Sequence, residues 1–113
     1  MPLSTLKYED IKYKDFFITH NARLNMEEAK VEVEVFNDTH LYSGEIDLIC
    51  LVDEVKTLVD IKTGSWDWKQ LIAYWKCQTE CNQLAIFDLK TGKLEVLDPL
   101  SLIANEHWEK FLI

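Results

Sequence analysis

Two carboxylates and a lysine lie inside apolar segments near the middle of this chain. Asp47 stands within the run IDLICLV, and Asp60 and Lys62 are two positions apart at the end of the run TLVDIK. An ionised side chain in an apolar surrounding costs several kcal/mol unless it is paired, hydrogen-bonded or bound to a metal ion. These three residues are therefore the first candidates for chemistry.

Carboxylates that lie close together need a cation. Each raises the pKa of the other unless positive charge lies between them. Oxygen ligands without a neighbouring histidine or thiolate favour a hard ion such as Mg²⁺, and Asp47, Asp60 and the backbone carbonyl of Ile61 would supply such ligands. The ammonium of Lys62 could then orient or help deprotonate an attacking water and neutralise charge on a phosphoryl group. The set indicates hydrolysis of a phosphodiester.

Strand pairing must bring these groups together. Residues 46–52 and 57–61 are apolar and rich in β-branched side chains, which predicts two strands joined by the polar turn DEVK. With the turn centred on the EV pair, antiparallel pairing sets Asp47 opposite Lys62, and Asp60 lies diagonally beside it. The alternative is a hairpin end that emerges into water, where the same three groups are solvated or form a weak ion pair.

A helix follows the second strand and adds two polar side chains. The segment Thr63-Gly64-Ser65 breaks the strand, and Ser65 is the predicted N-cap with Asp67 in the first turn. Gln70 and Tyr74 are one turn apart, so their side chains share an edge of the helix near the strand end that carries the lysine. The apolar stripe that would place this helix on the sheet consists of Trp68, Leu71, Ile72 and Trp75.

In chain order these residues form a recognisable pattern. Gly44-x-x-Asp47, Asp60-x-Lys62-Thr63-Gly64 and Gln70-x-x-x-Tyr74 resemble the motifs of the PD-(D/E)xK nuclease superfamily, most closely those of its RecB-like exonuclease branch. The resemblance covers residues 30–98, and the ordered set is more specific than any one piece. It implies an α/β protein with a restriction-endonuclease-like core, in which helices flank a central mixed β-sheet of four to five strands in an αβββαββ-like order.

The resemblance also implies an activity and a role for each residue. The protein would be a Mg²⁺- or Mn²⁺-dependent deoxyribonuclease, exonuclease-like, in DNA recombination, repair or phage and mobile-element DNA processing. Its products would carry a 5′-phosphate and a 3′-hydroxyl. Asp47, Asp60 and Lys62 would be catalytic, with the two carboxylates holding the metal. Gln70 and Tyr74 would support the site or contact the DNA backbone.

Two further residues are candidate metal ligands. Members of this branch usually carry an upstream histidine or glutamate that binds metal, and His20, which follows FFIT, is placed to substitute for it. A structural role is the alternative for a histidine beside an apolar run. Glu34 alternates with the valines of residues 31–35, so it either faces solvent or approaches the metal from the neighbouring strand.

The cysteines limit the remaining cofactor chemistry. Some relatives hold an iron–sulfur cluster with four cysteines, whereas this sequence has three, Cys50, Cys77 and Cys81. We therefore expect no iron–sulfur cluster. We expect reduced, partly buried thiols, as in a cytoplasmic protein.

The rest of the chain predicts the elements around this centre. The 113 residues are 48% hydrophobic, and we expect one domain, 1–113, without a signal peptide or a membrane-spanning run. A second hairpin is predicted from residues 83–89 and 94–97, and a last helix opens at Asp98-Pro99. Residues 8–19 fit either a short helix or irregular packing.

Net charge is the main objection to a nuclease. The chain carries 20 acidic and 12 basic residues, a formal charge of −8, whereas nucleic-acid binders usually present a basic surface. DNA is therefore expected to bind weakly and in a salt-sensitive way, with help from a homo-oligomer or a larger DNA-processing complex. Two alternatives on the same fold are a structure-specific endonuclease or junction resolvase, and a non-catalytic interaction module.

Overall fold

One mixed sheet organises the part of the chain that the structure describes. The computed structural model describes residues 17–77 and 80–113, and a helical turn over residues 17–20 precedes the first strand. The elements that follow are β1 (Leu24–Asn37), β2 (Tyr42–Val52), β3 (Val55–Lys62), α2 (Lys69–Cys77), β4 (Gln83–Asp88), β5 (Lys93–Leu97) and α3 (Leu102–Leu112). The five strands lie side by side in chain order, antiparallel except for the parallel pair β3 and β4. The expected α/β class with a mixed sheet is confirmed.

The hairpin of β2 and β3 is tighter than the sequence indicated. Val52 pairs with Val55, so the turn is Asp53-Glu54, and both turn residues have positive φ, 53° and 68°, as a type I′ turn requires. The prediction of a turn centred one residue later was wrong, because Val55 already belongs to β3. Each β2 residue therefore faces a β3 residue two positions earlier than expected. A shift of two keeps every side chain on its predicted face.

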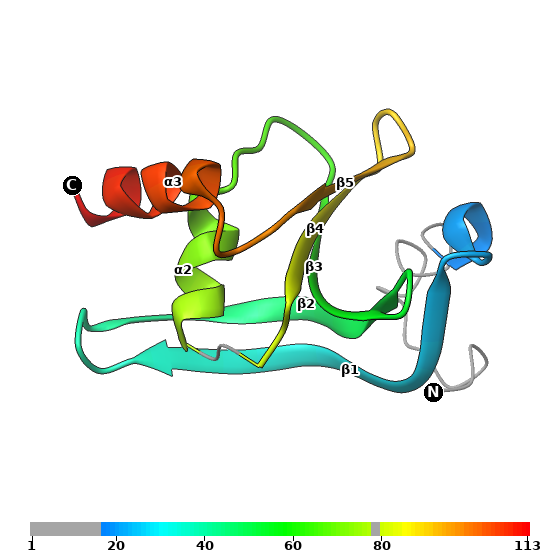
Figure 1. Cartoon of the computed structure of the whole chain (residues 1–113), viewed down its shortest axis with the longest axis horizontal. Helices are drawn as coiled ribbons and strands as arrows, with labels where there is room; N and C mark the ends of the chain where they lie inside the picture. The colour runs from blue at the N-terminus through cyan, green and yellow to red at the C-terminus, as the bar shows by residue number, and fades with distance from the viewer. Residues whose placement is uncertain (1–16, 78–79) are drawn as a thin grey trace.

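The sheet divides at one end of this hairpin. Backbone pairing of β2 with β3 extends from the turn as far as Leu48 and Val59, whereas β3 stays paired with β4 up to Lys62. Figure 1 shows β1 and β2 continuing together while β3, β4 and β5 turn away from them. We call this place the fork. Asp47 lies on its β2 arm, and residues 60–62 lie on its β3 arm.

Helix α2 lies in the angle of the fork and closes it (Figure 1). The hydroxyl of Tyr42, at the start of β2, donates to the carbonyl of Ala73 at 2.6 Å and ties the helix to that arm. Helix α3 packs on α2 through Ala104 and Trp108. The core on this face of the sheet is made by Ile46, Ile49, Leu58, Leu71, Ile72, Trp75, Cys81, Leu84, Ile86 and Ala104. The opposite face is covered by Leu48, Cys50, Val52, Val59, Ile61, Ala85 and Phe87.

Helix α2 begins later than the sequence predicted. Ser65 is exposed and lies before the helix, which begins at Lys69, and Asp67 instead accepts the Lys69 N–H with its Oδ1 at 2.8 Å. The predictions of Ser65 as N-cap and of Asp67 in the first turn were therefore wrong. Trp66 explains the delay, because its Nε1 donates to Oδ2 of Asp88 at 3.2 Å and its ring packs on the core. The bond to Asp88 therefore fixes the segment of residues 63–68, which links β3 to α2.

The C-terminal elements agree more closely with expectation. Strand β4 ends one residue before the predicted strand 83–89 does, and β5 begins one residue before the predicted strand 94–97. The last helix starts at Leu102 rather than at Pro99, because the Ser101 hydroxyl accepts the Ala104 N–H at 3.1 Å and caps it. Within residues 17–77 and 80–113, no helix is long and apolar enough to cross a membrane.

Candidate active site

The Asp47 carboxylate spans the fork. Its Oδ2 accepts the backbone N–H of Ile61 at 2.8 Å, beyond the point where β2 and β3 stop pairing. A side-chain oxygen therefore takes the place that a backbone carbonyl of β2 would have had in a continued ladder. In an antiparallel pair the N–H and C=O of one residue point toward the same partner, so the Ile61 carbonyl also faces the fork. Asp47 and Ile61 thus present three oxygen atoms to the same opening.

Asp60 lies on the face of the sheet that α2 covers. It pairs with Ile86 of β4, a residue of that core, and is only 7% exposed. Burial, followed by a side-chain hydrogen bond with Asp47, raises the pKa of Asp60 to about 7 against the opposing effect of Lys62. The two carboxylates are therefore close enough to share a proton.

Lys62 connects this carboxylate pair to the helix. Its Nζ lies 2.8 Å from Oδ2 of Asp60 and donates to Oε1 of Gln70 at 2.9 Å. An ammonium group has three donors, so these two acceptors fix its direction and use two of them. The structure thus brings Asp47, Asp60, Lys62 and Gln70 together from two strands and a helix.

Tyr74 supports the other arm of the fork. Its ring lies against Gly44 so closely that a Cβ built there would be 2.6 Å from Cζ and 2.7 Å from Oη of the tyrosine. A backbone hydrogen bond from Glu45 meets the phenol. Burial and the charge of Asp60 raise the pKa of Tyr74, so the phenol stays protonated at neutral pH and can donate. The motif glycine is therefore explained by a close side-chain approach, which the sequence pattern alone did not reveal.

Two candidate ligands lie elsewhere. Nε2 of His20 is 3.1 Å from the Gly92 carbonyl, and its ring packs edge-on against Phe87, which belongs to the opposite face of the sheet. Glu34 is exposed and pairs with Glu45 on the outer part of β1 and β2. In the described ranges, no group of three or more histidine, cysteine, aspartate or glutamate side chains gathers in a way that could hold a metal ion. The ligand set that the fork offers is two carboxylates and the Ile61 carbonyl.

This donor set fits a small, hard divalent cation. All its donor atoms are oxygens, and Mg²⁺ in proteins is commonly held by one or two carboxylates, with water and phosphate oxygens completing its shell. The raised pKa of Asp60 is the signature of excess negative charge in a dry place, which a cation would relieve. Mg²⁺ and Mn²⁺ both match these donors.

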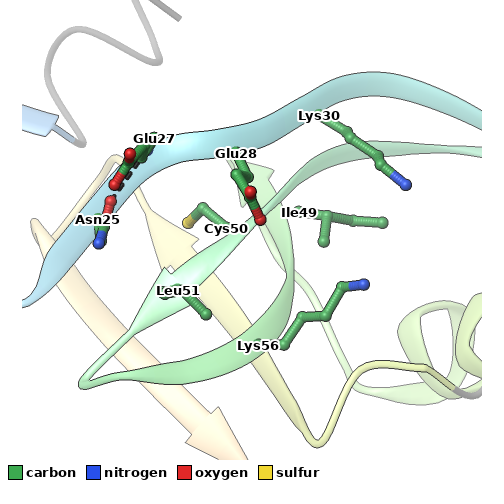
Figure 2. Close-up of a pocket in the computed structure, with 8 residues that line it drawn as sticks. All are labelled: Asn25, Glu27, Glu28, Lys30, Ile49, Cys50, Leu51 and Lys56. Atoms are coloured by element: carbon green, nitrogen blue, oxygen red, sulfur yellow. Dashed lines mark hydrogen bonds between the residues drawn. The ribbon is translucent and has the colours of Figure 1, made fainter.

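A different hollow lies where β1 bulges away from β2. Pairing of these strands is interrupted between Asn25 and Lys30, and a space of about 590 Å³ opens there. Figure 2 shows Lys30 and Lys56 on one side of it and Asn25 on the other. Both lysines reach Glu80, at 4.0 and 3.2 Å, and the carboxylates of Glu27 and Glu28 line the same hollow. This hollow therefore has little charge to offer an anion.

The cysteines take no part in the fork. Cys50 lies beside the hollow of Figure 2, and burial raises its pKa to about 12, so its thiol stays protonated at neutral pH. Burial also raises the pKa of Cys77. Cys50, Cys77 and Cys81 form no disulfide.

No protein-family model matches this sequence, and no curated protein matches it either. The geometry of the fork is consequently the ground on which a function can be assigned.

The buried carboxylate predicts an unusual dependence of stability on pH. Between about pH 4, where an unfolded aspartate ionises, and the folded pKa of about 7, the folded protein holds the extra proton. Stability should therefore fall as pH rises through this window. Asp60→Asn should remove this loss, so the difference in unfolding free energy between the two proteins should change by a few kcal/mol from pH 5 to pH 8. Urea unfolding in EDTA measures it, and parallel pH profiles would contradict it.

The contact of Gly44 with Tyr74 predicts a strong coupling between the two residues. Gly44→Ala should destabilise the protein by about 1–3 kcal/mol, because the new methyl group meets a rigid ring. In a Tyr74→Ala background the same change should be neutral or stabilising by up to about 1 kcal/mol. A double-mutant cycle in urea tests this coupling. Equal effects in both backgrounds would show that the ring does not require glycine.

Proposed function

We propose that this protein is a metal-dependent deoxyribonuclease that hydrolyses DNA phosphodiester bonds. The observation that carries the proposal is the meeting of Asp47, Asp60 and Lys62 at the fork, with Gln70 of α2 bonded to the lysine. The order of elements, three strands, a helix and two strands, is also the order that the resemblance to the PD-(D/E)xK superfamily implies. A restriction-endonuclease-like core and RecB-like, exonuclease-like action are parts of this proposal.

The carboxylates would form the metal-binding side of the site. Asp47 and Asp60 would hold Mg²⁺ or Mn²⁺ together with the Ile61 carbonyl. When bound, such an ion supplies positive charge and Lewis acidity to a phosphate group. Asp47 also keeps its bond to the Ile61 N–H, so the direction of its carboxylate is set before any ligand arrives. Preorganised ligands of this kind bind without rearranging the strands.

Lys62 would act on the substrate. Its ammonium is held by Asp60 and Gln70 and keeps one further donor, which can reach a phosphoryl oxygen or an attacking water. There it would neutralise charge that develops during hydrolysis, an effect that is strong at a site partly shielded from solvent. Gln70 is then a positioning residue, because it touches the lysine through Oε1 and directs it.

Tyr74 would hold the two arms at the right separation. Its hydroxyl meets the backbone at Glu45 and its ring fills the space over Gly44, so the β2 arm cannot move toward α2. The neutral phenol also remains a donor that can bind a backbone phosphate. Tyr74 therefore supports the site mainly through the position of the arm that carries Asp47.

A second candidate is an interaction module. Near the start of α3, Leu100 and Leu102 are 81% and 84% exposed, and Ile103 is also exposed. Apolar side chains gathered on one helix commonly mark a protein contact. This surface would suit a homo-oligomer or a larger DNA-processing complex, and it makes no use of Lys62. It accounts for α3 but not for the polar contacts at the fork.

Loss of the lysine should abolish cleavage. With Mg²⁺ or Mn²⁺ the protein should degrade linear or single-stranded DNA, and EDTA should stop the reaction. Lys62→Ala should lower the rate by at least roughly a hundredfold, while Lys90→Ala, an exposed lysine in the turn after β4, should leave it unchanged. Circular dichroism and the urea midpoint check that both variants fold. Full activity of Lys62→Ala, or no cleavage of linear, circular, branched or single-stranded DNA by the folded protein, would exclude this function.

Metal binding should be measurable without any substrate. Calorimetry with Mn²⁺ should detect binding that Asp60→Asn weakens by at least about tenfold, whereas Asp38→Asn, an exposed carboxylate in the loop after β1, should bind as the wild type does. Because the pKa of Asp60 is about 7, binding at about pH 6 should release protons, and the heat should depend on the buffer. Equal binding by both variants would place the ion elsewhere.

A further inference from the structure

A hollow of about 450 Å³ opens beside Lys62, and Asp47 is not among its lining residues. We call it the Lys110 hollow. It lies between the link that precedes α2, the first turn of α2 and the last turn of α3. Its lining residues are Lys62, Ser65, Trp66, Asp67, Lys69, Gln70, Lys110 and Phe111. One end of this hollow is therefore the lysine and glutamine of the candidate active site, and the other is the C-terminal helix.

The lining of the Lys110 hollow is positive in a strongly acidic protein. Among the described residues that line it, three carry ammonium groups, Lys62, Lys69 and Lys110, and one carries a carboxylate, Asp67. Lys62 is already paired with Asp60 at 2.8 Å. The carboxylate of Asp67 lies 3.8 Å from Lys69, and both side chains are about half exposed, so the pairing is weak. The positive charge that an anion meets in this space therefore comes mainly from Lys69 and Lys110.

Two aromatic rings line the same space, and both are held in place. Trp66 is bonded through Nε1 to Asp88 and lies edge-on to Trp68, with 5.7 Å between ring centres. Phe111 is stacked on Trp108 at 5.7 Å, with an interplanar angle of 17°. Rings that are already fixed lose little conformational freedom when a flat ligand packs against them.

We propose that the Lys110 hollow binds one unpaired nucleotide of a single-stranded DNA substrate, next to the phosphate that the active site cleaves. This inference rests on the proposed nuclease function. The base packs against Trp66 or Phe111, and Lys69 and Lys110 contact the flanking phosphates. Lysines interleaved with fixed aromatic rings are the means by which proteins bind single strands without reading sequence.

The choice of a single strand follows from the rings. A base presents a free π-face to a side chain only when it is unstacked, and bases inside a duplex are stacked on both sides. The volume of the hollow also lies in the range that encloses one small ligand. The hollow of Figure 2 is different, because Glu27 and Glu28 offset its two lysines and none of its described lining residues is aromatic.

Binding in EDTA separates this proposal from catalysis. Fluorescence anisotropy with a labelled oligothymidylate of about 15 nucleotides should show that Trp66→Ala and Phe111→Leu each weaken binding at least fivefold, roughly the lower limit for loss of a base–ring stack. Lys110→Ala should also weaken binding and reduce the slope of log K against log salt by about 0.7. Lys90→Ala is the matched control outside the hollow and should bind within about twofold of wild type. A blunt hairpin duplex should bind more weakly than the single strand.

The outcomes distinguish the two proposals. If the wild type binds the single strand through Trp66, Phe111 and Lys110 but cleaves no DNA, the proposal for the Lys110 hollow is supported and the proposed nuclease function is refuted. If Lys62 is needed for cleavage but the variants of Trp66, Phe111 and Lys110 bind and cleave as the wild type does, the nuclease function is supported and the proposal for the hollow is refuted. The proposal for the hollow is also refuted if the wild type does not bind the single strand in EDTA, or if Lys90→Ala loses as much affinity as the hollow variants. Phe111 and Lys110 lie at the end of α3, so their variants remain informative if Trp66→Ala does not fold.

Discussion

The hydrogen bond from the Ile61 N–H to the Asp47 carboxylate is the contact on which the candidate site depends. A two-stranded ladder normally satisfies strand amides with strand carbonyls and leaves no space between the strands. Here the side chain replaces the carbonyl, so β2 can leave β3 while the Ile61 N–H stays bonded. The opening that results leaves room for the side chains of Asp47, Asp60 and Lys62 to meet at a place where the sheet would otherwise be closed.

Helix α2 then sets the width of the fork, because its two polar residues contact different arms. Gln70 bonds to Lys62 on the β3 arm, and Tyr74 packs on Gly44 of the β2 arm. Because the two residues are one helical turn apart, their spacing sets the separation of the two arms. It therefore also sets the separation of Asp47 from Lys62. Tyr42 adds a third tie by donating to the carbonyl of Ala73. A fork held in this way resists the repulsion between its carboxylates, which would otherwise drive the arms apart.

The site could be predicted from sequence because its geometry depends on a period of two. The error in the turn moved the partner of Asp47 by two residues, so its face was unchanged, and a shift of one would have removed it from the site. The cap of α2 was missed because the bond from Trp66 to Asp88 links residues far apart in sequence, and local propensity does not contain it. The approach of Lys110 and Phe111 to Lys62 likewise depends on how α3 packs on α2, to which no spacing rule applies.

A net charge of −8 argues against DNA binding only if charge is spread evenly over the surface. At physiological ionic strength, exposed charges are screened beyond about 8 Å, so a phosphate at Lys62 responds chiefly to groups within that distance. Lys69 and Lys110 line the hollow beside Lys62, and a divalent cation would neutralise the carboxylates of the fork. The many acidic residues elsewhere slow the approach of a polyanion more than they weaken its final contacts, because steering acts at long range and binding acts at short range. An acidic chain can therefore hold a nucleic acid at one positive hollow, with the rest of its surface keeping it from binding elsewhere.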